Sequence, residues 1–354
     1  YARFVDDHRL QIDDHTIVEA ERIVIATGSS PSYPAPWKKL GDRLIVNDDV
    51  FDWTDLPGSV AVFGPGVIGL EIGQALSRLG VEVSLFGRGG LFGPLTDPKV
   101  MASARESIGN EFYINDDVDV LRMERVGDGV EIEFANDDGS KHRVNVDYVI
   151  AATGRRPNLR GLGLENTTLP LDDRGVPLFD ASTLQIGDSH VFIAGDVNDD
   201  RPLLHEAADE GRIAGNNAGR FPDVEARFRS SSIAVVFSDP QIAMVGDTFA
   251  SLDGRNFVTG EVSFEDQGRS RVMLKNDGLL RVYADASNGR FLGAEMFGPR
   301  AEHIAHLLAW AHQSRLTVDE MLEMPFYHPV IEEGLRTALR DAAAKRKGGL
   351  RKAA

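Results

Sequence analysis

Residues 60–88 constrain the fold of this chain more than any other stretch of its sequence. The apolar run Val60–Phe63 has the length and composition of a buried strand. Apolar residues at helical spacing follow, up to Gly80, where we expect the helix to end, and residues 81–86 then alternate like a second strand. Between the first strand and the helix stand three glycines in G-x-G-x-x-G spacing: Gly64, Gly66 and Gly69. This order of strand, glycine turn, helix and strand predicts an α/β unit that binds a dinucleotide.

Each glycine has a physical role in such a unit. Gly64 is expected to make the tight turn, Gly66 to let the backbone approach a pyrophosphate, and Gly69 to let the helix pack close to the strand. The free amides and the partial positive charge at the helix N-terminus favour phosphate groups. Pro65 departs from the pattern, because proline removes one amide donor from the loop. A glycine-rich turn without a ligand is the alternative interpretation.

The contacts to the dinucleotide are expected from the loop, the start of the helix and the end of the second strand. The candidate residues are Gly64, Gly66, Val67, Ile68, Gly69, Glu71, Gly87 and Arg88. In NAD-binding units an acidic residue ends the second strand and binds the adenine ribose, but that position here is Gly87. Arg88 follows it, and a guanidinium suits the 2′-phosphate of NADP. We therefore favour NADP, or dual specificity, over strict NAD; an exposed loop cation is the alternative interpretation of Arg88.

Length, charge and cysteine content limit the other classes of function. The 354 residues predict two or three domains, and a hydrophobic content of 42% allows a sizeable core. The net charge of −17 argues against nucleic acid and anionic membranes as main partners. These residues contain no cysteine, which excludes disulfides, thiolate metal sites and cysteine nucleophiles among them. We expect no metal site and a cytoplasmic location.

Two other expected strands end in the same three residues, Ala-Thr-Gly. The first lies within residues 22–31, and the second lies within residues 147–158, where Arg-x-Pro-Asn follows it. This echo suggests two related nucleotide-binding folds. A third buried strand, residues 191–194, delivers Asp196 to its C-terminal end, where ligands of open α/β sheets bind. A carboxylate at that point can hydrogen-bond a sugar or ribityl hydroxyl, and a turn aspartate is the alternative interpretation.

From about Ser230 the sequence predicts several strands followed by several helices. The expected strands span residues 233–237, 257–264, 273–276, 278–284 and 289–296, and the expected helices span residues 301–313, 318–324 and 331–343. Strands grouped before helices suggest an α+β domain. The basic residues at the end of the chain are expected to be disordered.

Five motifs in a fixed order resemble those of the flavin-dependent pyridine nucleotide–disulfide oxidoreductases. They are Ala-Thr-Gly, G-x-G-x-x-G, Ala-Thr-Gly-Arg-x-Pro-Asn, Phe-Ile-Ala-Gly-Asp and a late His-Pro-x-x-x-Glu. The resemblance covers the chain except for its basic tail, and within the family it is strongest to the dihydrolipoamide dehydrogenases. It implies FAD and either NAD or NADP as cofactors, and a homodimer.

The resemblance also implies a domain organisation. A Rossmann-like NAD(P) domain would be inserted in a partial FAD-binding domain, and an α+β dimerisation domain would follow. The expected segments are 1–36 as the end of the first half of the FAD domain, 37–153 as the NAD(P) domain, 154–225 as the second half of the FAD domain, 226–345 as the interface domain and 346–354 as the disordered tail.

The resemblance assigns further residues to the flavin. Thr27, Gly28 and Gly154, at the two Ala-Thr-Gly ends, would contact the cofactors, and Asp196 would hold the ribityl chain of FAD. The helix beside the flavin ring would begin near Leu204 and His205. The sequence Pro-Leu-Leu-His-Glu at this point departs from the commoner pattern of the family.

His328 and Glu333 match the catalytic dyad of the family. His328 would be the general base that takes a proton from the dithiol, and Glu333 would hold its imidazole in the useful tautomer. In the family this histidine reaches the flavin of the partner subunit. The alternative is a His-Pro turn before a helix, with Glu332 and Glu333 favouring the helix dipole.

The front half of the family pattern has no counterpart in this sequence. That half carries the FAD glycine loop and a Cys-x4-Cys redox disulfide, so we expect the chain to be a fragment that is inactive by itself. The parent activity would pass electrons between a dihydrolipoamide-like dithiol and NAD(P), with a 2-oxo acid dehydrogenase complex as a possible partner. The alternatives are a soluble transhydrogenase or related flavin disulfide reductase, and a non-catalytic dimer module that binds nucleotide.

Overall fold

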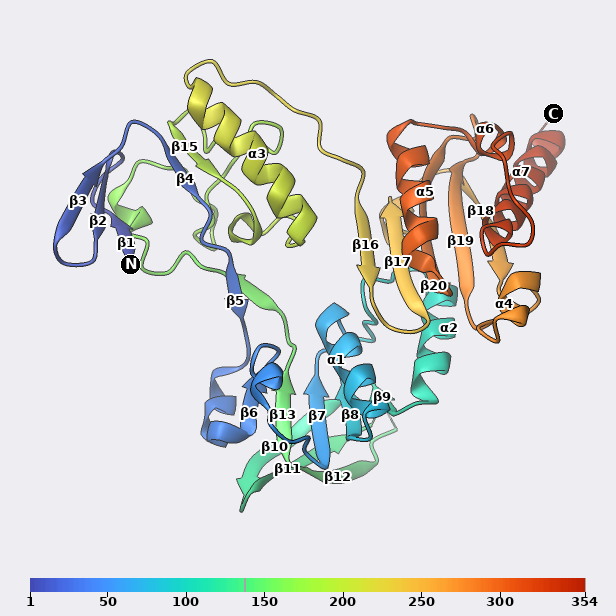
Figure 1. Cartoon of the computed structure of the whole chain (residues 1–354), viewed down its shortest axis with the longest axis horizontal. Helices are drawn as coiled ribbons and strands as arrows, with labels where there is room; N and C mark the ends of the chain where they lie inside the picture. The colour runs from blue at the N-terminus through green and yellow to red at the C-terminus, as the bar shows by residue number, and fades with distance from the viewer. Residues whose placement is uncertain (137, 354) are drawn as a thin grey trace. The chain divides into compact units, whose positions relative to one another are not determined.

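The computed structural model describes the backbone of residues 1–136 and 138–353, and the side chains up to residue 348. The chain forms two compact units, each built from segments that are distant in sequence. One unit comprises residues 1–32 and 154–229, and the other comprises residues 33–153 and 230–354 (Figure 1). No helix of the described chain has the length and apolar character needed to cross a membrane. The five finer segments expected from the sequence stay a prediction.

The first unit contains three small sheets and one long helix. The antiparallel sheet is formed by β1 (Ala2–Phe4), β2 (Arg9–Ile12) and β3 (Thr16–Glu19), and the parallel pair by β4 (Ile23–Ile25) and β15 (Val191–Ile193). The antiparallel pair is formed by β5 (Ser29–Pro31) and β14 (Arg155–Pro157). The helices are η3 (Leu164–Asn166), η4 (Asp196–Asn198) and α3 (Leu204–Arg220). The apolar side of α3 packs on β15 through Ile213, Ala214 and Phe192.

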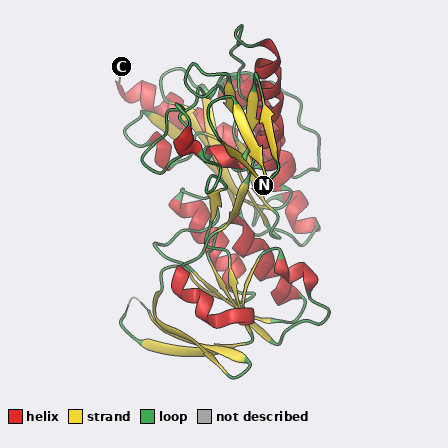
Figure 2. Cartoon of the chain, turned by 90° about the vertical axis from the view of Figure 1, so that its left-hand side faces the viewer, coloured by secondary structure: helices red, strands yellow, loops and turns green. Residues whose placement is uncertain are grey.

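The second unit begins with a five-stranded parallel sheet, as an α/β dinucleotide-binding unit requires. Its strands, in spatial order, are β6 (Leu44–Val46), β13 (Tyr148–Ala151), β7 (Ser59–Phe63), β8 (Glu82–Phe86) and β9 (Tyr113–Asn115). The associated helices are η1 (Ala35–Arg43), η2 (Asp49–Asp52), α1 (Val67–Arg78) and α2 (Pro98–Gly109). A separate antiparallel sheet, at the lower edge of Figure 2, is formed by β10 (Asp119–Val126), β11 (Gly129–Ala135) and β12 (Lys141–Val146).

The end expected for the first helix is confirmed. Gly80 has φ = 92° and lies just after the C-cap of α1, where a left-handed residue is needed. Its amide bonds to the carbonyl of Ser77 at 2.9 Å, and the amide of Val81 bonds to that of Leu76 at 3.0 Å. These two bonds close the helix in a Schellman motif and turn the chain into β8.

The C-terminal part of the second unit is an antiparallel sheet with helices against it (Figure 1). Its strands, in spatial order, are β16 (Ile233–Val236), β17 (Gln241–Gly246), β20 (Phe291–Gly298), β19 (Leu279–Asp285) and β18 (Phe257–Ser263). The helices are η5 (Ala250–Leu252), α4 (Gly268–Val272), α5 (Ala301–Gln313), α6 (Val318–Leu322) and α7 (Glu333–Ala353). Buried alanines of α5 and α7 let these helices pack closely on the sheet.

One expectation for this part is wrong. Residues 273–276 do not form a strand, because α4 ends at Val272 and Met273 is its C-cap. α7 continues to Ala353, and the disorder expected for residues 346–354 stays a prediction. Alanine, lysine and arginine favour helix, and Arg346 forms an ion pair with Asp319. Residue 354 lies outside the described residues.

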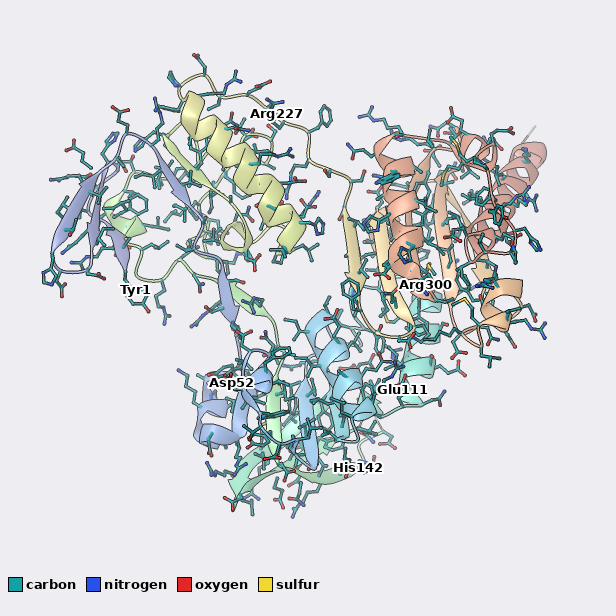
Figure 3. The ribbon with its side chains drawn as sticks, viewed as in Figure 1. Tyr1, Asp52, Glu111, His142, Arg227 and Arg300 are labelled. Atoms are coloured by element: carbon teal, nitrogen blue, oxygen red, sulfur yellow. The ribbon has the colours of Figure 1, made fainter. Side chains whose placement is uncertain are left out.

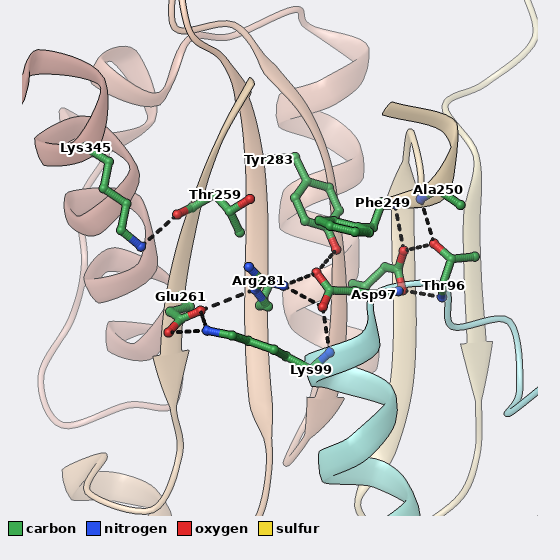
Figure 4. Close-up of polar contacts among 11 residues, drawn as sticks. Thr96, Asp97, Lys99, Phe249, Ala250, Thr259, Glu261, Arg281, Tyr283 and Lys345 are labelled. Carbon is green, nitrogen blue, oxygen red and sulfur yellow. Dashed lines mark hydrogen bonds and ion pairs between the residues drawn. The ribbon is translucent and has the colours of Figure 1, made fainter. Parts of the chain in front are cut away.

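Buried polar contacts fasten α2 to the C-terminal sheet (Figure 4). Asp97 is the N-cap of α2 and accepts from the amide of Lys99 at 3.0 Å. Nη1 of Arg281 donates to both carboxylate oxygens of Asp97 at 2.6 Å, and the hydroxyl of Tyr283 donates to one of them at 3.0 Å. Burial raises the pKa of Tyr283, which keeps the hydroxyl protonated as a donor.

A second buried carboxylate completes this junction. Glu295 on β20 accepts from the amides of Thr96, Asp97 and Phe249 at 2.7, 2.8 and 2.8 Å, and from the hydroxyl of Thr96 at 2.6 Å. Glu295 is fully buried, and its side chain accepts all four of these bonds. The segment that leads into α2 is therefore tied directly to the core of the C-terminal sheet.

Candidate functional site

The glycine loop between β7 and α1 has the shape that the sequence predicted. Gly64 has φ = 108°, and a Cβ there would overlap the carbonyl oxygen of Ala152 at the end of β13. A Cβ on Gly69 would overlap the carbonyl oxygen of Gly64. Any larger residue at either position would push the helix and the two strands apart. These two glycines are therefore required by packing within the chain itself.

Gly66 is different, because the space beside it is open. It is the N-cap of α1, and a Cβ there would have no heavy atom within 4 Å. A small residue beside open space at a helix N-terminus fits the close approach of a pyrophosphate. Val67 and Ile68 follow as the first two residues of α1. The cofactor contacts assigned to the loop stay predictions.

Crowding at the end of β8 explains why no ribose-binding carboxylate stands there. A Cβ on Gly87 would lie 2.6 Å from Cγ of Pro65 and 2.8 Å from the carbonyl oxygen of Asp116. The proline of the glycine loop and the turn at Asp116 thus occupy the space of a strand-end side chain. Arg88 is exposed, and it has no ion pair or hydrogen bond with any residue that the structure describes.

Polar residues of α1 hold the end of β16. Oε1 of Glu71 accepts from the amide of Phe237 at 2.8 Å, and Gln74 exchanges hydrogen bonds with the backbone of Asp239 at 2.8 and 3.0 Å. Arg78 pairs with Asp239 at 3.1 Å and with Glu111, labelled in Figure 3, at 2.8 Å. Glu71 thus has a partner within the chain, and its contact with a cofactor stays a prediction.

In the first unit, Asn158 links the segments that follow the two Ala-Thr-Gly ends by hydrogen bonds. Its backbone carbonyl accepts from the hydroxyl of Thr27 at 2.9 Å, and its side-chain Nδ2 donates to the carbonyl of Thr27 at 3.0 Å. Its backbone amide donates to the carbonyl of Gly28 at 2.9 Å. The carbonyl of Gly154 accepts from Ser32 at 2.9 Å. β5 and β14, the strands that follow these two ends, pair directly with each other.

Asp196 follows β15 and begins η4. One carboxylate oxygen accepts from the hydroxyl of Ser29 at 2.7 Å, and Nε of Arg155 lies 4.0 Å from the same oxygen. The side chain remains 26% exposed. An oriented and partly exposed carboxylate at a strand end can accept a hydrogen bond from a ribityl hydroxyl. The residues present therefore fit a flavin here.

Sequence reasoning missed the residues that hold this turn. Oε2 of Glu210, on α3, accepts from the amide of Gly195 and from Nδ2 of Asn198, both at 2.7 Å. Nη2 of Arg229 donates to Oε1 of Glu210 at 2.5 Å and to Glu206 at 3.1 Å. Burial raises the pKa of Glu210, and the hydrogen bonds and Arg229 oppose that shift. Two glutamates four residues apart on the buried side of a helix were the available signal.

The two remaining flavin candidates begin α3. Leu204 is 88% exposed, and His205 is exposed as well. The first amides of a helix have no partner inside it, so this end can receive hydrogen-bond acceptors. The roles of Leu204 and His205 stay predictions.

The structure brings His328 and Glu333 together. Nδ1 of His328 lies 3.0 Å from both carboxylate oxygens of Glu333, the first residue of α7. The hydrogen bond from His328, followed by one from the amide of Val330, lowers the pKa of Glu333. The side chain of His328 is 80% exposed, and Nε2 bonds to no group among the described residues. The dyad therefore presents an oriented imidazole with a free nitrogen.

Hydrogen bonds and a buried side chain fix the segment that carries His328. Nε2 of Gln267 donates to the carbonyl of Val330 at 2.7 Å, and Ile331 is buried in the core of the C-terminal sheet. The amide of Val330 donates to Glu333 at 3.2 Å. These contacts suit a catalytic dyad and also a turn that begins a helix. The catalytic role of the pair stays a prediction.

Two family models cover most of the chain. Residues 1–211 match the model described as pyridine nucleotide-disulphide oxidoreductase, and residues 232–339 match the dimerisation domain of the same family. The chain belongs to the pyridine nucleotide-disulphide oxidoreductase family. Members of this family are FAD- and NAD(P)-dependent oxidoreductases, so the expected class of enzyme and its cofactors are confirmed.

Relatives in this family have two different names. The chain is 30% identical to a dihydrolipoyl dehydrogenase of Haloferax volcanii, over 96% of this chain and 73% of the relative. It is 28% identical to a soluble pyridine nucleotide transhydrogenase of Photorhabdus laumondii, over 95% of this chain and 73% of the relative. Both names agree with the two enzymatic activities expected from the sequence.

Solved structures of the family share the fold. The flavoprotein disulfide reductase RclA of Escherichia coli superposes with a TM-score of 0.83 at 22% identity, over 96% of this chain and 78% of that one. LpdA of Mycobacterium tuberculosis superposes with a TM-score of 0.80 at 25% identity, over 94% and 72%. The α/β fold with a C-terminal α+β dimerisation domain is thereby confirmed.

Proposed function

We propose that this protein transfers electrons between a dihydrolipoamide-like dithiol and NAD(P), with His328 as the general base. The observation that carries the proposal is the pairing of His328 with Glu333 at 3.0 Å, which leaves the second ring nitrogen exposed. The name of the Haloferax relative supports the choice of dithiol.

The dyad fixes the tautomer that a base needs. The lowered pKa of Glu333 keeps its carboxylate ionised, so this carboxylate accepts the Nδ1 proton of His328. Neutral imidazole then carries its lone pair on Nε2, the nitrogen that faces outward. A thiol placed against Nε2 can transfer its proton there and become the more reactive thiolate.

The overall reaction balances without any further reactant. A dithiol and NAD(P)⁺ become a disulfide, NAD(P)H and one proton, and bound FAD supplies the transfer of two electrons between the two substrates. His328 accepts the released proton and passes it to solvent, to which it is open. In this proposal Gly66 and the start of α1 hold the pyrophosphate of the nicotinamide, and Asp196 holds the ribityl chain of FAD.

The test is the replacement of His328 by alanine in the full-length protein. We expect dithiol oxidation to slow by about two to four orders of magnitude, the usual contribution of a positioned acid–base group. The Kd of NADH and of NADPH should not change. The matched control is His303→Ala, which removes another exposed histidine of the same part of the chain. Dithiol oxidation at the wild-type rate in His328→Ala would reduce His328 to a turn residue.

We propose NADPH as the preferred nicotinamide, or equal use of both. Gly87 has no room for a ribose-binding carboxylate, and Arg88 has a free guanidinium for a 2′-phosphate. Titrations with NADH and NADPH, repeated on Arg88→Glu, test this. Loss of about tenfold in NADPH affinity alone would support Arg88, since that is the order of one charge-assisted hydrogen bond. A preference for NADH that the variant leaves unchanged would remove Arg88 from the site.

Transhydrogenation is the second candidate. Hydride exchange between two nicotinamides through a flavin needs no thiol, and these 354 residues contain no cysteine. The transhydrogenase relative also supports it. Purified full-length protein is offered NADPH with an NAD⁺ analogue, and separately NAD⁺ with dihydrolipoamide. Turnover in the first assay alone selects the transhydrogenase, and bound flavin without turnover in either assay selects the non-catalytic module.

The dimer is expected to place residues 230–343 at its interface. Sedimentation of the full-length protein at micromolar concentration should give a dimer. A strictly monomeric protein would contradict an interface that carries His328 toward the second subunit. A cytoplasmic location and a 2-oxo acid dehydrogenase complex as partner stay predictions.

A further inference from the structure

A buried carboxylate accepts two hydrogen bonds from the turn that carries Asp196. Oε2 of Glu210 receives two hydrogen bonds of 2.7 Å, from the amide of Gly195 and from Nδ2 of Asn198. The two donors stand on either side of Asp196 in the chain. The side chain of Glu210 is only 1% exposed, so water does not compete for these bonds. The backbone around Asp196 therefore depends on the position of one side chain of α3.

Arg229 holds Glu210 from the opposite side. Nη2 of Arg229 lies 2.5 Å from Oε1 of Glu210, and Arg229 also pairs with Glu206 and Asp200. The guanidinium is 12% exposed, so this attraction is weakly screened. Because each oxygen of Glu210 has its own donors, the carboxylate can take only one orientation.

The turn itself is not a conformation that the chain adopts by default. Gly195 has φ = 79° and ψ = −165°, a region open to glycine alone, and a Cβ there would lie 3.3 Å from Cβ of Ala207. Its amide is buried, so without Glu210 it would lack an acceptor. An amide in that situation turns towards water, and it would take Asp196 with it.

From these contacts we propose that Glu210 is a positioning residue for flavin binding: it fixes residues 195–198 so that the carboxylate of Asp196 is presented to the ribityl chain of FAD. The inference rests on the role proposed above for Asp196. Glu210 acts through the turn and not by contact with the cofactor.

Three variants separate this role from general stability. Glu210→Ala removes the acceptor of the turn and the partner of Arg229. Glu210→Gln keeps an oxygen for Gly195 and Asn198 but presents an amide to Arg229. Glu206→Gln is the matched control, because Glu206 is equally buried on the same helix and also pairs with Arg229, yet it makes no bond to the turn.

The affinity for FAD is measured by titrating flavin-free protein and following flavin fluorescence. We expect Glu210→Ala to raise the Kd about tenfold or more, the order expected for one unsatisfied buried amide. Glu210→Gln should lie between Glu210→Ala and the wild type, and Glu206→Gln should stay within about twofold of the wild type. Unfolding of the flavin-free variants in urea shows whether the loss is confined to binding.

Hydrogen exchange of flavin-free protein gives a readout that needs no cofactor. A peptide spanning residues 194–198 should exchange faster in Glu210→Ala, and at the wild-type rate in Glu206→Gln. Wild-type exchange of this peptide in Glu210→Ala would overturn the inference. An equal loss of FAD affinity in Glu206→Gln and Glu210→Ala would overturn it as well.

Asp196→Ala distinguishes failure of this inference from failure of the proposed function. If Asp196→Ala weakens FAD binding and Glu210→Ala does not, only the positioning role of Glu210 is wrong. If Asp196→Ala in the full-length protein binds FAD as the wild type does, the proposed flavin site itself is wrong and the positioning role falls with it.

Discussion

The glycine loop at residues 64–69 and the turn at residues 195–198 hold their backbones in two different ways. The loop is fixed by shape, because Gly64 and Gly69 lie where any Cβ would overlap a carbonyl oxygen. The turn is fixed by charge, because the buried carboxylate of Glu210 accepts hydrogen bonds from the amide of Gly195 and the side-chain amide of Asn198. A backbone fixed by shape depends on the space that its neighbours leave, here the space beside Ala152, whereas one fixed by charge depends on an ion pair elsewhere in the chain.

The comparison also bears on what each region tolerates. The loop cannot accept larger residues but carries no buried charge, so it should be insensitive to pH. The turn also needs a glycine, at position 195, but in addition it depends on Glu210 and Arg229 remaining paired. A larger side chain should therefore disrupt the glycine loop, and removal of the arginine that pairs with Glu210 should disrupt the turn.

The largest effect is expected from Arg229→Met. It leaves Glu210 buried without its cation, and breaking a buried pair from one side costs about 3–5 kcal/mol. The free energy of unfolding in urea measures this loss. Arg227→Met is the control, because that arginine pairs with Glu225 near the surface and should change stability by less than about 1 kcal/mol. Equal losses in the two variants would mean that burial does not distinguish the pairs.

A smaller but still clear effect is expected from Gly69→Ala. The added Cβ would overlap the carbonyl oxygen of Gly64, and overpacking of this kind costs about 1–3 kcal/mol. Gly66→Ala is the matched variant, since its Cβ meets only open space. It should leave stability within about 0.5 kcal/mol of the wild type but weaken NAD(P)H binding. A destabilised Gly66→Ala would show that the loop has no open side.

The smallest effects are expected from pH, and they have opposite signs in two carboxylates. Burial raises the pKa of Glu210, so its contribution to stability is present below its unfolded pKa near 4.5 and is lost as the pH rises through the folded value. The hydrogen bond from His328 lowers the pKa of Glu333, so its contribution is present above 4.5 and is lost as the pH falls through the folded value.

Unfolding in urea at several pH values tests these signs. The stability of the wild type relative to Glu210→Gln should decrease with rising pH, and that relative to Glu333→Gln should increase. Two curves that slope the same way would contradict the different environments of the two carboxylates. The His328 and Arg88 variants described above complete the set.

The sequence predicts the parts of this molecule that depend on neighbouring residues. The glycine spacing led to the loop and to α1, and the helix expected at residues 301–313 is α5 with the same bounds. The dyad was expected from the resemblance to the family, and its two residues are only five positions apart. In each case the physical cause lies within a few positions of the signal.

The parts that were missed depend on distant partners. Glu210 meets Gly195 and Arg229 at separations of 15 and 19 residues, and no local pattern indicates those contacts. β17 is one strand that the sequence analysis did not propose, and it lies between β16 and β20 in the sheet. A strand was expected at residues 273–276, directly after the short helix α4, which begins where the side chain of Gln267 accepts from the amide of Ser270.

The contacts that α1 makes with residues 237–239 limit how this enzyme could be re-engineered. Glu71, Gln74 and Arg78 belong to the helix that follows the glycine loop, yet their partners lie in the C-terminal part of the chain. A chimera that imported the whole nicotinamide-binding segment from a relative would break all three attachments at once. Changes of coenzyme preference should therefore be grafted as single residues at the end of β8, with α1 left in its own background.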